Sequence, residues 1–346
     1  MNTHEKYMYR CLELAQKGAG FVAPNPMVGS VLVFEDTIIG EGYHARFGNA
    51  HAEVNCINSV SEENKHLIPK STLYVSLEPC AHFGKTPPCA NFIVEHQIKN
   101  VVIGCKDVFA KVNGAGIAIL QNAGVQVTLN VLEKECLELN KRFFTFHQLQ
   151  RPYVVLKWAE TANGFIGKRN ERILITNEFS NRKVHQWRTE EAAILVGTKT
   201  ALLDNPQLTN RLAVGNHPIR LVIDKHLQIP ETAHVFNSVA KTIVFNFSYN
   251  HQKQHIRWYQ LNAHTPLIPQ ILEACFQLNI QSILIEGGAK TIQSFIDANL
   301  WDEARVIKSN RSADNADVIA PILAAAQLVD SYSIESDDIF IYKPQY

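Results

Sequence analysis

Four residues in the N-terminal part of the chain have the types needed to bind a metal ion and activate water. His51 offers an imidazole nitrogen, and Cys80 and Cys89 each offer a thiolate sulfur. Zinc accepts these donors, and a catalytic zinc site keeps three protein ligands and leaves the fourth position for water. The metal lowers the pKa of that water towards neutrality. Glu53 lies two residues after His51, so its carboxyl is the candidate to carry protons to a departing group.

The order of these residues narrows the chemistry. A His-x-Glu triplet followed by Pro-Cys and a second cysteine is the signature of zinc-dependent nucleobase deaminases. Here the second cysteine comes nine residues after the first (89 − 80), and the intervening loop contains His82 and Lys85. The other interpretation is that Cys80 and Cys89 are buried thiols that only pack, as cysteines often do. We favour the metal site because four matching residue types stand in the right order.

Composition excludes several classes of protein. The chain has 346 residues, enough for two domains, and 33 basic and 33 acidic side chains give it no net charge. Neither half has the basic excess of a domain that neutralises many nucleic-acid phosphates. The N-terminus lacks the pattern of a signal peptide, and no apolar run has the length of a membrane span. The chain has seven cysteines, an odd number, and no export signal. We therefore expect a reducing, cytoplasmic location, in which cysteines bind metal and do not form disulfides.

Strands and helices alternate around the metal motif. Hydrophobic periodicity predicts helices over 4–17, 50–60, 116–122 and about 132–142, with Cys89 opening another. The strands are expected over 30–34, 37–43, 71–77, 101–104 and 125–129. His51 and Cys89 both fall at helix starts, where anions such as thiolates are favoured. The pattern predicts an α/β sandwich with a mixed sheet and helices on both faces, against which Phe143, Phe144 and Phe146 pack.

Two further polar residues of this half are candidates for substrate contact. Asn25 stands between Pro24 and Pro26, which hold the segment extended. Its amide both donates and accepts, so it could read a pyrimidinone edge, or it could be a plain turn residue. His44 follows the second strand and could touch substrate or lie at the surface. The residues alone leave both pairs of alternatives open.

A second alternating pattern follows a boundary near 148–152. Helices are expected over 177–188, 197–203 and 267–278 and after Thr291. The strands are expected over 153–158, 193–196, 219–223, 242–245, 257–261, 282–285, 303–309 and 332–343.

The most distinctive turn of this half is Glu286-Gly287-Gly288, between a strand and a helix. Glycines let the backbone approach a phosphate at a helix N-terminus. The segment lacks the G-x-G-x-x-G fingerprint, and a turn without a ligand accounts for it equally well. A set of polar residues in the same half could belong to a site or to a solvated helix end: Thr198, Thr200, Asp204 and Arg211.

Taken together, these segments resemble one family over nearly the full chain, the bifunctional deaminase/reductase of riboflavin biosynthesis. The matching segments are 24–29, 42–44, 51–53, 78–89, 151–153, 204–209 and 286–288. The long loop between Cys80 and Cys89 is a feature of this family. The chain departs from the family at Thr161-Ala162-Asn163-Gly164, where Ser-Leu-Asp-Gly is usual. It also has Arg172 and Leu174 where many members have Ser and Trp.

The resemblance implies a cytidine-deaminase-like α/β/α sandwich over 1–147 and a dihydrofolate-reductase-like α/β domain over 151–346. It implies one zinc ion per chain, NADPH, and a small phosphorylated substrate, 2,5-diamino-6-(5-phosphoribosylamino)pyrimidin-4(3H)-one. The first domain would replace the 2-amino group of this compound by oxygen. The second would reduce the ribosyl unit to ribityl.

The resemblance also implies roles for individual residues, carried over by position. Glu53 would be catalytic, and the zinc ligands would be His51, Cys80 and Cys89. The deaminase substrate would be held by Asn25, His44, His82 and Lys85. The reductase substrate would be held by Arg188, Leu208, Arg211 and Glu286. The reductase cofactor would be lined by Lys157, Thr200, Asp204, Gly288, Ala289, Lys290 and Thr291.

Two other functions share the zinc motif. A deaminase of nucleic acid, such as tRNA, with an accessory C-terminal domain is the main alternative, although the neutral charge of both halves weighs against it. The second alternative is a protein that keeps zinc only for folding. Glu53 argues against this alternative because folding needs no proton carrier. We therefore expect an enzyme of small molecules, a homo-oligomer that binds neither nucleic acid nor membrane.

Overall fold

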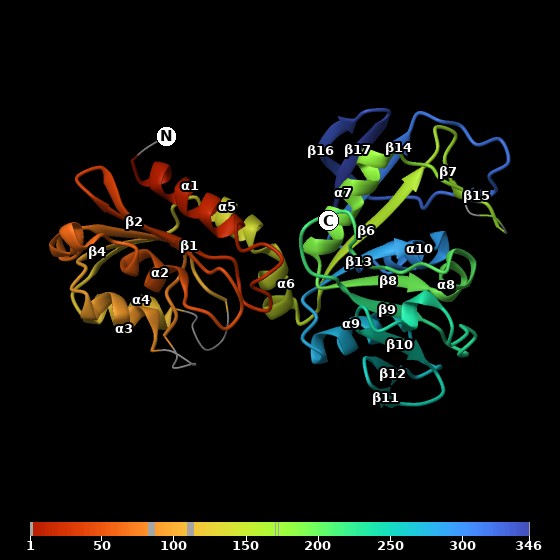
Figure 1. The fold of residues 1–346 in the computed structure, drawn as a ribbon, viewed down its shortest axis with the longest axis horizontal. Coiled ribbons are helices and arrows are strands. Elements are labelled where there is room, and N and C mark those ends of the chain that lie inside the picture. Colours follow the sequence, from red (N-terminus) through yellow and green to blue (C-terminus); the bar gives the residue numbers. More distant parts are fainter. Residues whose placement is uncertain (1–2, 82–86, 109–113, 170, 172, 346) are drawn as a thin grey trace. The chain divides into compact units, whose positions relative to one another are not determined.

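The computed structural model describes residues 3–81, 87–108, 114–169, 171 and 173–345. The chain forms two compact units, Met1–Leu149 and Gln150–Tyr346 (Figure 1). Each unit has its own sheet and its own apolar core. Among the described residues, no helix combines the length and the apolar character needed to cross a bilayer.

The first unit is built on a mixed sheet that has the strand order β2-β1-β3-β4-β5 in the described residues. Its strands are β1 (Gly29–Phe34), β2 (Thr37–Tyr43), β3 (Thr72–Leu77), β4 (Asn100–Cys105) and β5 (Gln126–Thr128). Strand β1 runs antiparallel to β2 and β3, whereas β3, β4 and β5 are parallel. Glu35 and Asp36 both have positive φ, which suits the tight turn between β1 and β2.

Helices cover both faces of this sheet (Figure 1). Alternate side chains of a strand point to opposite faces, so Val31 and Leu32 of β1 enter different cores. The core around Leu32 is covered by α2 (Ala52–Asn58), α3 (Cys89–Glu95) and α4 (Ala115–Asn122). The core around Val31 is covered by α1 (Thr3–Gln16), α5 (Glu133–Leu139) and α6 (Lys141–Leu149). A 3-10 segment, Glu62–Lys70, joins α2 to β3. The predicted α/β/α sandwich is confirmed.

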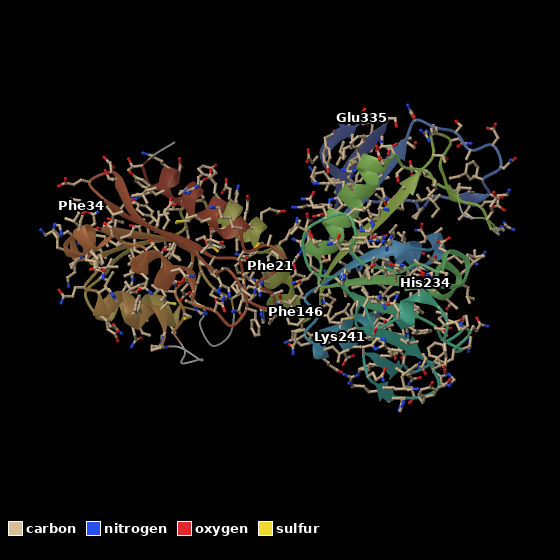
Figure 2. The ribbon with its side chains drawn as sticks, viewed as in Figure 1. Phe21, Phe34, Phe146, His234, Lys241 and Glu335 are labelled. Atoms are coloured by element: carbon tan, nitrogen blue, oxygen red, sulfur yellow. The ribbon has the colours of Figure 1, made fainter. Side chains whose placement is uncertain are left out.

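The helix predicted over 132–142 is wrong, because the chain forms α5 and α6 with a break at Asn140. The Asn140 side chain accepts the N–H of Met27 and donates to its carbonyl oxygen, both at 2.8 Å. An amide side chain that pairs in this way offers the backbone an alternative to a continuous helix. Phe143, Phe144 and Phe146 are buried on α6, as predicted, and Figure 2 shows Phe146 on that helix.

The second unit has a larger sheet, which the described residues order as β11-β12-β10-β9-β8-β13-β6-β14-β17-β16. Neighbouring strands are parallel from β12 to β14 and antiparallel at both ends. The central strands are β6 (Tyr153–Glu160), β8 (Ala193–Gly197), β9 (Ile219–Ile223), β10 (Thr242–Asn246), β12 (Ile256–Gln260), β13 (Ser282–Gly287) and β14 (Glu303–Ser309). The antiparallel strand next to β12 is β11 (His251–Lys253). A separate small sheet pairs β7 (Phe165–Gly167) with β15 (Val318–Ile319).

Helices cover both faces of this sheet as well. One face packs against α9 (Leu267–Gln277) and α10 (Ala289–Asp297). The other packs against α7 (Glu178–Glu190) and α8 (Thr198–Asp204), and a short 3-10 turn, His234–Phe236, lies on the same side. In open α/β sheets, ligands bind at the carboxyl ends of the parallel strands. The ends of β6, β8 and β13 are therefore the place to look for a site.

The tail predicted as one strand over 332–343 is instead a hairpin. It consists of β16 (Ala326–Ile334) and β17 (Asp337–Pro344), paired antiparallel. Glu335 makes the turn with φ of 53°, and Figure 2 shows it between the two strands. Hairpin turns with positive φ usually contain Asn or Gly, and the turn at Glu335 contains neither.

Candidate active sites

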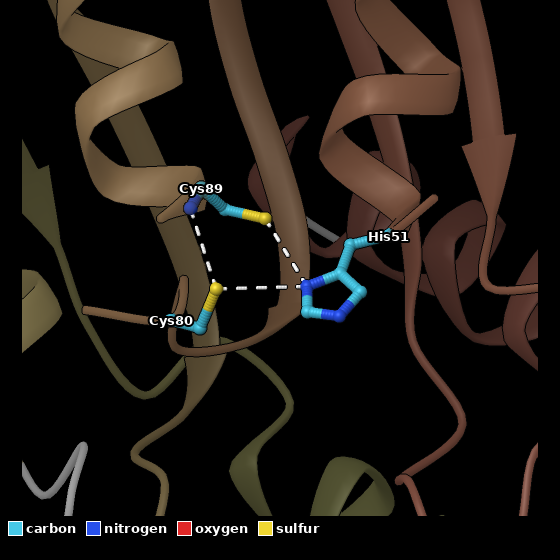
Figure 3. Close-up of side chains that lie close together, drawn as sticks. All are labelled: His51, Cys80 and Cys89. Atoms are coloured by element: carbon cyan, nitrogen blue, oxygen red, sulfur yellow. Dashed lines mark hydrogen bonds between the residues drawn. The ribbon is translucent and has the colours of Figure 1, made fainter. Parts of the chain in front are cut away.

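The structure brings the three predicted metal ligands together from three different segments. His51 is the N-cap residue of α2, Cys80 follows the end of β3, and Cys89 is the first residue of α3. The His51 Nδ1 atom lies 3.5 Å from Cys80 Sγ and 3.3 Å from Cys89 Sγ (Figure 3). All three donor atoms lie within 4.8 Å of one another. One imidazole and two thiol donors in such a cluster suit a zinc ion.

Close packing explains why these segments meet. A Cβ atom on Gly42 would lie 2.2 Å from the backbone nitrogen of Cys56, so β2 runs directly against α2. On the other side of the cluster, the N–H of Ala90 donates to the Cys80 carbonyl oxygen at 3.2 Å. The N–H of Cys89 donates to Cys80 Sγ at 3.3 Å. Cys80 is thus attached to the first turn of α3.

Glu53 lies beside this cluster, in the first turn of α2, with 3% of its surface exposed. Burial raises the pKa of its carboxyl to about 7, and a negative charge on Cys80 acts in the same direction. The hydrogen bond with Cys89 lowers the pKa of the Cys80 thiol to about 4, and His51 contributes to that shift. The cluster therefore favours a thiolate beside a carboxyl that exchanges protons near neutral pH.

His44 lies against the predicted metal ligand His51, and Asn25 lies against His44. The His44 ring is 2% exposed and contacts the His51 ring edge-on, with 5.4 Å between the centroids. Its Nδ1 lies 3.1 Å from the Ala50 carbonyl oxygen, and its Nε2 lies 3.1 Å from Asn25 Nδ2. A carbonyl oxygen only accepts, so Nδ1 carries the hydrogen and Nε2 accepts from Asn25. His44 is not a surface residue, which the sequence alone had left open.

The second unit contains a cavity of about 880 Å³ at the carboxyl ends of its parallel strands. This volume is large for a small-molecule site and suits a nucleotide-sized ligand. Glu286 and Leu174 are among its lining residues. The lining also includes every residue for which the family resemblance implies cofactor contact: Lys157, Thr200, Asp204, Gly288, Ala289, Lys290 and Thr291.

Gly288 shapes one wall of this cavity. Its φ of +78° is a conformation that glycine adopts without strain, and a Cβ atom there would lie 3.2 Å from Thr200 Oγ1. Helix α10 begins immediately afterwards, so its free N–H groups face the same region. The sequence left Glu286-Gly287-Gly288 as a site or a plain turn, and the cavity lies at this turn.

A largely buried ion pair, with 13% and 9% of its two side chains exposed, joins α7 to β13 at this cavity. Arg188 bonds both oxygens of Glu286 at 2.7 Å. Burial alone would raise the pKa of the Glu286 carboxyl, but the charge and hydrogen bonds of Arg188 lower it to about 2, and Lys157 assists. Burial in turn lowers the pKa of Lys157. The cavity therefore presents an ionised carboxylate fixed between cations.

Comparison with known proteins gives this geometry a family. Residues 1–105 match the model of the cytidine and deoxycytidylate deaminase zinc-binding region, and residues 152–309 match that of the RibD C-terminal domain. The riboflavin biosynthesis protein RibD of Aquifex aeolicus is 37% identical over 306 residues, which cover 86% of this chain and 84% of that protein. The chain belongs to the RibD family of riboflavin biosynthesis proteins.

Solved structures agree with the RibD assignment. A deaminase/reductase from Thermotoga maritima has a TM-score of 0.90 and 35% identity, and 99% of each chain is covered. RibD from Acinetobacter baumannii has a TM-score of 0.90 and 29% identity, again with 99% of each chain covered. The predicted cytidine-deaminase-like and dihydrofolate-reductase-like folds are confirmed. The chain is a bifunctional deaminase and reductase of riboflavin biosynthesis that uses zinc and NADPH.

Other residues singled out by the RibD resemblance either lie outside the described residues or do not line the cavity. His82, Lys85 and Arg172 lie outside the described residues. Arg188, Leu208, Arg211 and Asn163 are not among the described residues that line the cavity, although Arg188 reaches it through Glu286.

Leu208 and Arg211 belong to one loop after α8. Leu208 is 3% exposed with φ of 53°, an unusual value for a leucine. Arg188 donates to the Thr209 carbonyl oxygen at 3.1 Å, and His185 Nδ1 accepts the N–H of Arg211 at 3.0 Å. Two side chains of helix α7, Arg188 and His185, therefore fix the conformation of this loop.

Several site residues were missed by sequence reasoning. Four cations from three segments line the RibD-type cavity: Lys168, Arg169, Lys199 and Lys225. They have no common motif, and only the fold gathers them. His185 was missed as well, and its spacing of three residues from Arg188 on a predicted helix was the available signal.

The contact between His185 and Arg211 predicts a pH dependence of stability. Burial lowers the pKa of His185 from 6.5 to about 4, and the charges of Arg188 and Arg211 act in the same direction, while Glu286 opposes them. The unfolded chain then binds this proton more readily than the folded one. The stabilisation is fully present above pH 6.5 and is lost as the pH falls through about 4.

The measurement is a set of urea titrations between pH 7 and pH 4, followed by tryptophan fluorescence. All four tryptophans lie in the second unit, so the signal reports that unit alone. His185→Asn keeps an acceptor but does not titrate, so its free energy of unfolding should fall less steeply with pH than that of the wild type. Parallel curves for the two proteins would contradict the prediction.

Proposed function

We propose that the first unit, as a deaminase domain over 1–147, replaces the 2-amino group of 2,5-diamino-6-(5-phosphoribosylamino)pyrimidin-4(3H)-one by oxygen. The reductase domain over 151–346 would then reduce the ribosyl unit of the product to ribityl. One observation carries the first assignment: the His51, Cys80 and Cys89 donors lie within 4.8 Å of one another, beside the buried Glu53 carboxyl. The substrate is supported by the Thermotoga maritima protein, which is named a diaminohydroxyphosphoribosylaminopyrimidine deaminase/5-amino-6-(5-phosphoribosylamino)uracil reductase.

In the deaminase, His51, Cys80 and Cys89 would hold the zinc ion, which supplies Lewis acidity when bound. Glu53 takes a proton from the attacking water on its carboxylate and delivers it to the departing amine. Burial raises the pKa of the Glu53 carboxyl above its ordinary value, which favours a group that both accepts and returns a proton. Burial of Glu53 keeps bulk water from competing for that proton.

Substrate positioning is assigned to the residues around this centre. Asn25 donates to His44, which leaves its Oδ1 and its second N–H to pair with a pyrimidinone edge. His44 is fixed by the Ala50 carbonyl, so the orientation of the Asn25 amide is fixed in turn. His82 and Lys85 are proposed as further contacts on the family resemblance, with Lys85 as a point charge for the phosphate.

In the reductase, the cavity-lining residues would hold NADPH, which supplies the hydride when bound. Gly288, Ala289, Lys290 and Thr291 would hold a phosphate of the cofactor at the start of α10, and Lys157, Thr200 and Asp204 would line the rest of its site. The substrate would be held by Arg188, Leu208, Arg211 and Glu286. The Arg188–Glu286 pair keeps the Glu286 carboxylate oriented. Catalysis then depends mainly on positioning the two ligands.

Family membership favours this small-molecule substrate over the nucleic-acid alternative. The expectations of a homo-oligomer and of a cytoplasmic location stay predictions. The reaction itself is tested by incubating zinc-loaded protein with the diaminopyrimidinone phosphate, with and without NADPH, followed by mass analysis. We expect an oxygen-for-amine exchange without NADPH and a further gain of two hydrogens with it. Unchanged substrate in both arms would contradict the proposed function.

Loss of one ligand should remove the metal. Cys80→Ser replaces a thiolate by a hydroxyl, which is a poor zinc donor at neutral pH, so zinc content should fall from one per chain to a small fraction of that. Cys275→Ala is the control, because this buried cysteine belongs to the second unit. Metal analysis after dialysis checks both variants, and full zinc content in Cys80→Ser would remove Cys80 from the ligand set.

A further inference from the structure

A buried carboxylate lies two residues before the metal ligand Cys80. Glu78 follows the end of β3, is 3% exposed, and its own N–H donates to the Cys105 carbonyl oxygen at 3.0 Å. Its Oε2 atom accepts the N–H of Asp107 at 3.2 Å and that of Gly114 at 3.0 Å. One oxygen of Glu78 is therefore bonded to the segment that follows β4.

The other oxygen reaches the first turn of α4. Glu78 Oε1 accepts the N–H of Gly116 at 3.0 Å and that of Ile117 at 3.3 Å. Both oxygens thus accept from backbone donors, with two N–H groups directed at each oxygen. The start of a helix also favours negative charge. Four backbone bonds offset the loss of hydration of the buried charge.

Pro79, between Glu78 and the ligand Cys80, is held by close backbone packing. A Cβ atom on Gly116 would lie 1.9 Å from the Pro79 carbonyl oxygen, so the backbone of Pro79 rests directly on the start of α4. Cys80 itself is bonded on its other side to Ala90 and Cys89 of α3. The segment 78–80 is therefore attached to α4 before the ligand and to α3 at the ligand.

We propose that Glu78 is a positioning residue of the metal centre. Its carboxylate fixes the Pro79-Cys80 backbone against α4, and so holds Cys80 Sγ where the donors of His51 and Cys89 converge. The inference rests on the proposed function, in which Cys80 is a zinc ligand. Among the described residues, the hydrogen bonds of the Glu78 carboxylate come from backbone N–H groups and not from the side chains of the metal cluster, so it acts through Cys80.

Glu78→Gln tests this role with little change in shape. The amide keeps one acceptor oxygen but turns its NH₂ group towards two backbone N–H donors, so half of the bonds are lost. We expect the zinc dissociation constant to rise about 10–100-fold, the range found when groups that orient metal ligands are removed. Glu41→Gln is the matched control, because Glu41 bonds Arg10 at 2.7 Å and is not part of the metal cluster.

The readouts are zinc affinity by competition with a chelator and the visible spectrum of the Co²⁺-loaded protein, which reports thiolate coordination. We expect weaker zinc binding and an altered cobalt spectrum in Glu78→Gln, wild-type values in Glu41→Gln, and unchanged reductase activity in both. A purely structural role would lower the unfolding temperature and leave affinity and spectrum unchanged, which would overturn the proposal.

A second variant approaches the same contact from α4. Gly116→Ala places a methyl group against the Pro79 carbonyl and 3.3 Å from Glu78 Oε1, so it should displace segment 78–80 and weaken zinc binding while the Glu78 carboxylate itself is retained. Wild-type zinc affinity in a folded Gly116→Ala protein would also overturn the positioning role. Failure of the wild-type chain to bind zinc at this cluster would overturn the proposed function as well, whereas normal wild-type binding with unaffected variants overturns the positioning role alone.

Discussion

Glu53→Gln is expected to retain zinc and lose deamination. The amide keeps the size of the side chain but cannot take a proton from water and pass it to the leaving amine. Deaminase turnover should fall by at least about 10²–10⁴-fold, the contribution typical of a general acid–base group. Glu53 is 3% exposed and bulk water cannot easily replace it as a proton carrier, so the upper part of that range is expected.

The reductase of the same chain is the internal control for this variant. The second unit has its own core and its own cavity, so reduction of previously deaminated substrate should proceed at the wild-type rate. Zinc analysis must show one ion per chain, since loss of metal would also stop deamination. Near-normal deamination by zinc-loaded Glu53→Gln would show that another group carries the proton.

Gly288→Asp is expected to lose reductase activity and retain deaminase activity, the reverse of Glu53→Gln. The new carboxylate would stand at the start of α10 and repel a cofactor phosphate there. Like charges in a binding site cost several kcal/mol, and every 1.4 kcal/mol is tenfold, so kcat/KM for NADPH should fall roughly 10²-fold. Deamination should be unchanged, and the two half-reactions are measured separately with each substrate supplied.

The backbone of Gly288 calls for a control for strain. Its φ of +78° is unfavourable for any side chain, and a Cβ atom would approach Thr200 Oγ1 at 3.2 Å. Gly288→Ala carries the same strain without the charge, so the difference between Ala and Asp isolates electrostatic repulsion. An equal loss in both variants would mean that the phosphate does not lie at this turn. Unchanged kcat/KM for NADPH in Gly288→Asp would remove the cofactor from this wall of the cavity.

The sequence alone determined the chemistry of the first site. Zinc selects ligands by donor type, so His51, Cys80 and Cys89 could be proposed as its ligands without knowing how the chain folds, and the structure brings their donor atoms together. A proton carrier must be a titratable group close to the metal, and Glu53 is two residues from a ligand. The alternation of strands and helices likewise depends on local periodicity, and it predicted both α/β units.

Local periodicity predicted less well where a distant contact overrides it. Asn140 interrupts the helix predicted over 132–142 because its side chain pairs with Met27, 113 residues earlier. The turn at Glu335 has positive φ without Gly or Asn, so the sequence predicts one strand where the structure has the hairpin of β16 and β17. Neither feature has a signal in a short window of sequence.

Tertiary structure decided which polar residues act together. His44 could have been a surface residue until the fold placed it between Asn25 and the Ala50 carbonyl. The Arg188–Glu286 pair joins residues 98 positions apart, and the backbone donors to Glu78 come from 29 to 39 positions away. A side chain's type states what it can donate or accept. The hydrogen-bond partner of a side chain depends on which segments the sheet and helices bring within about 3 Å of it. Only the folded chain determines those neighbours.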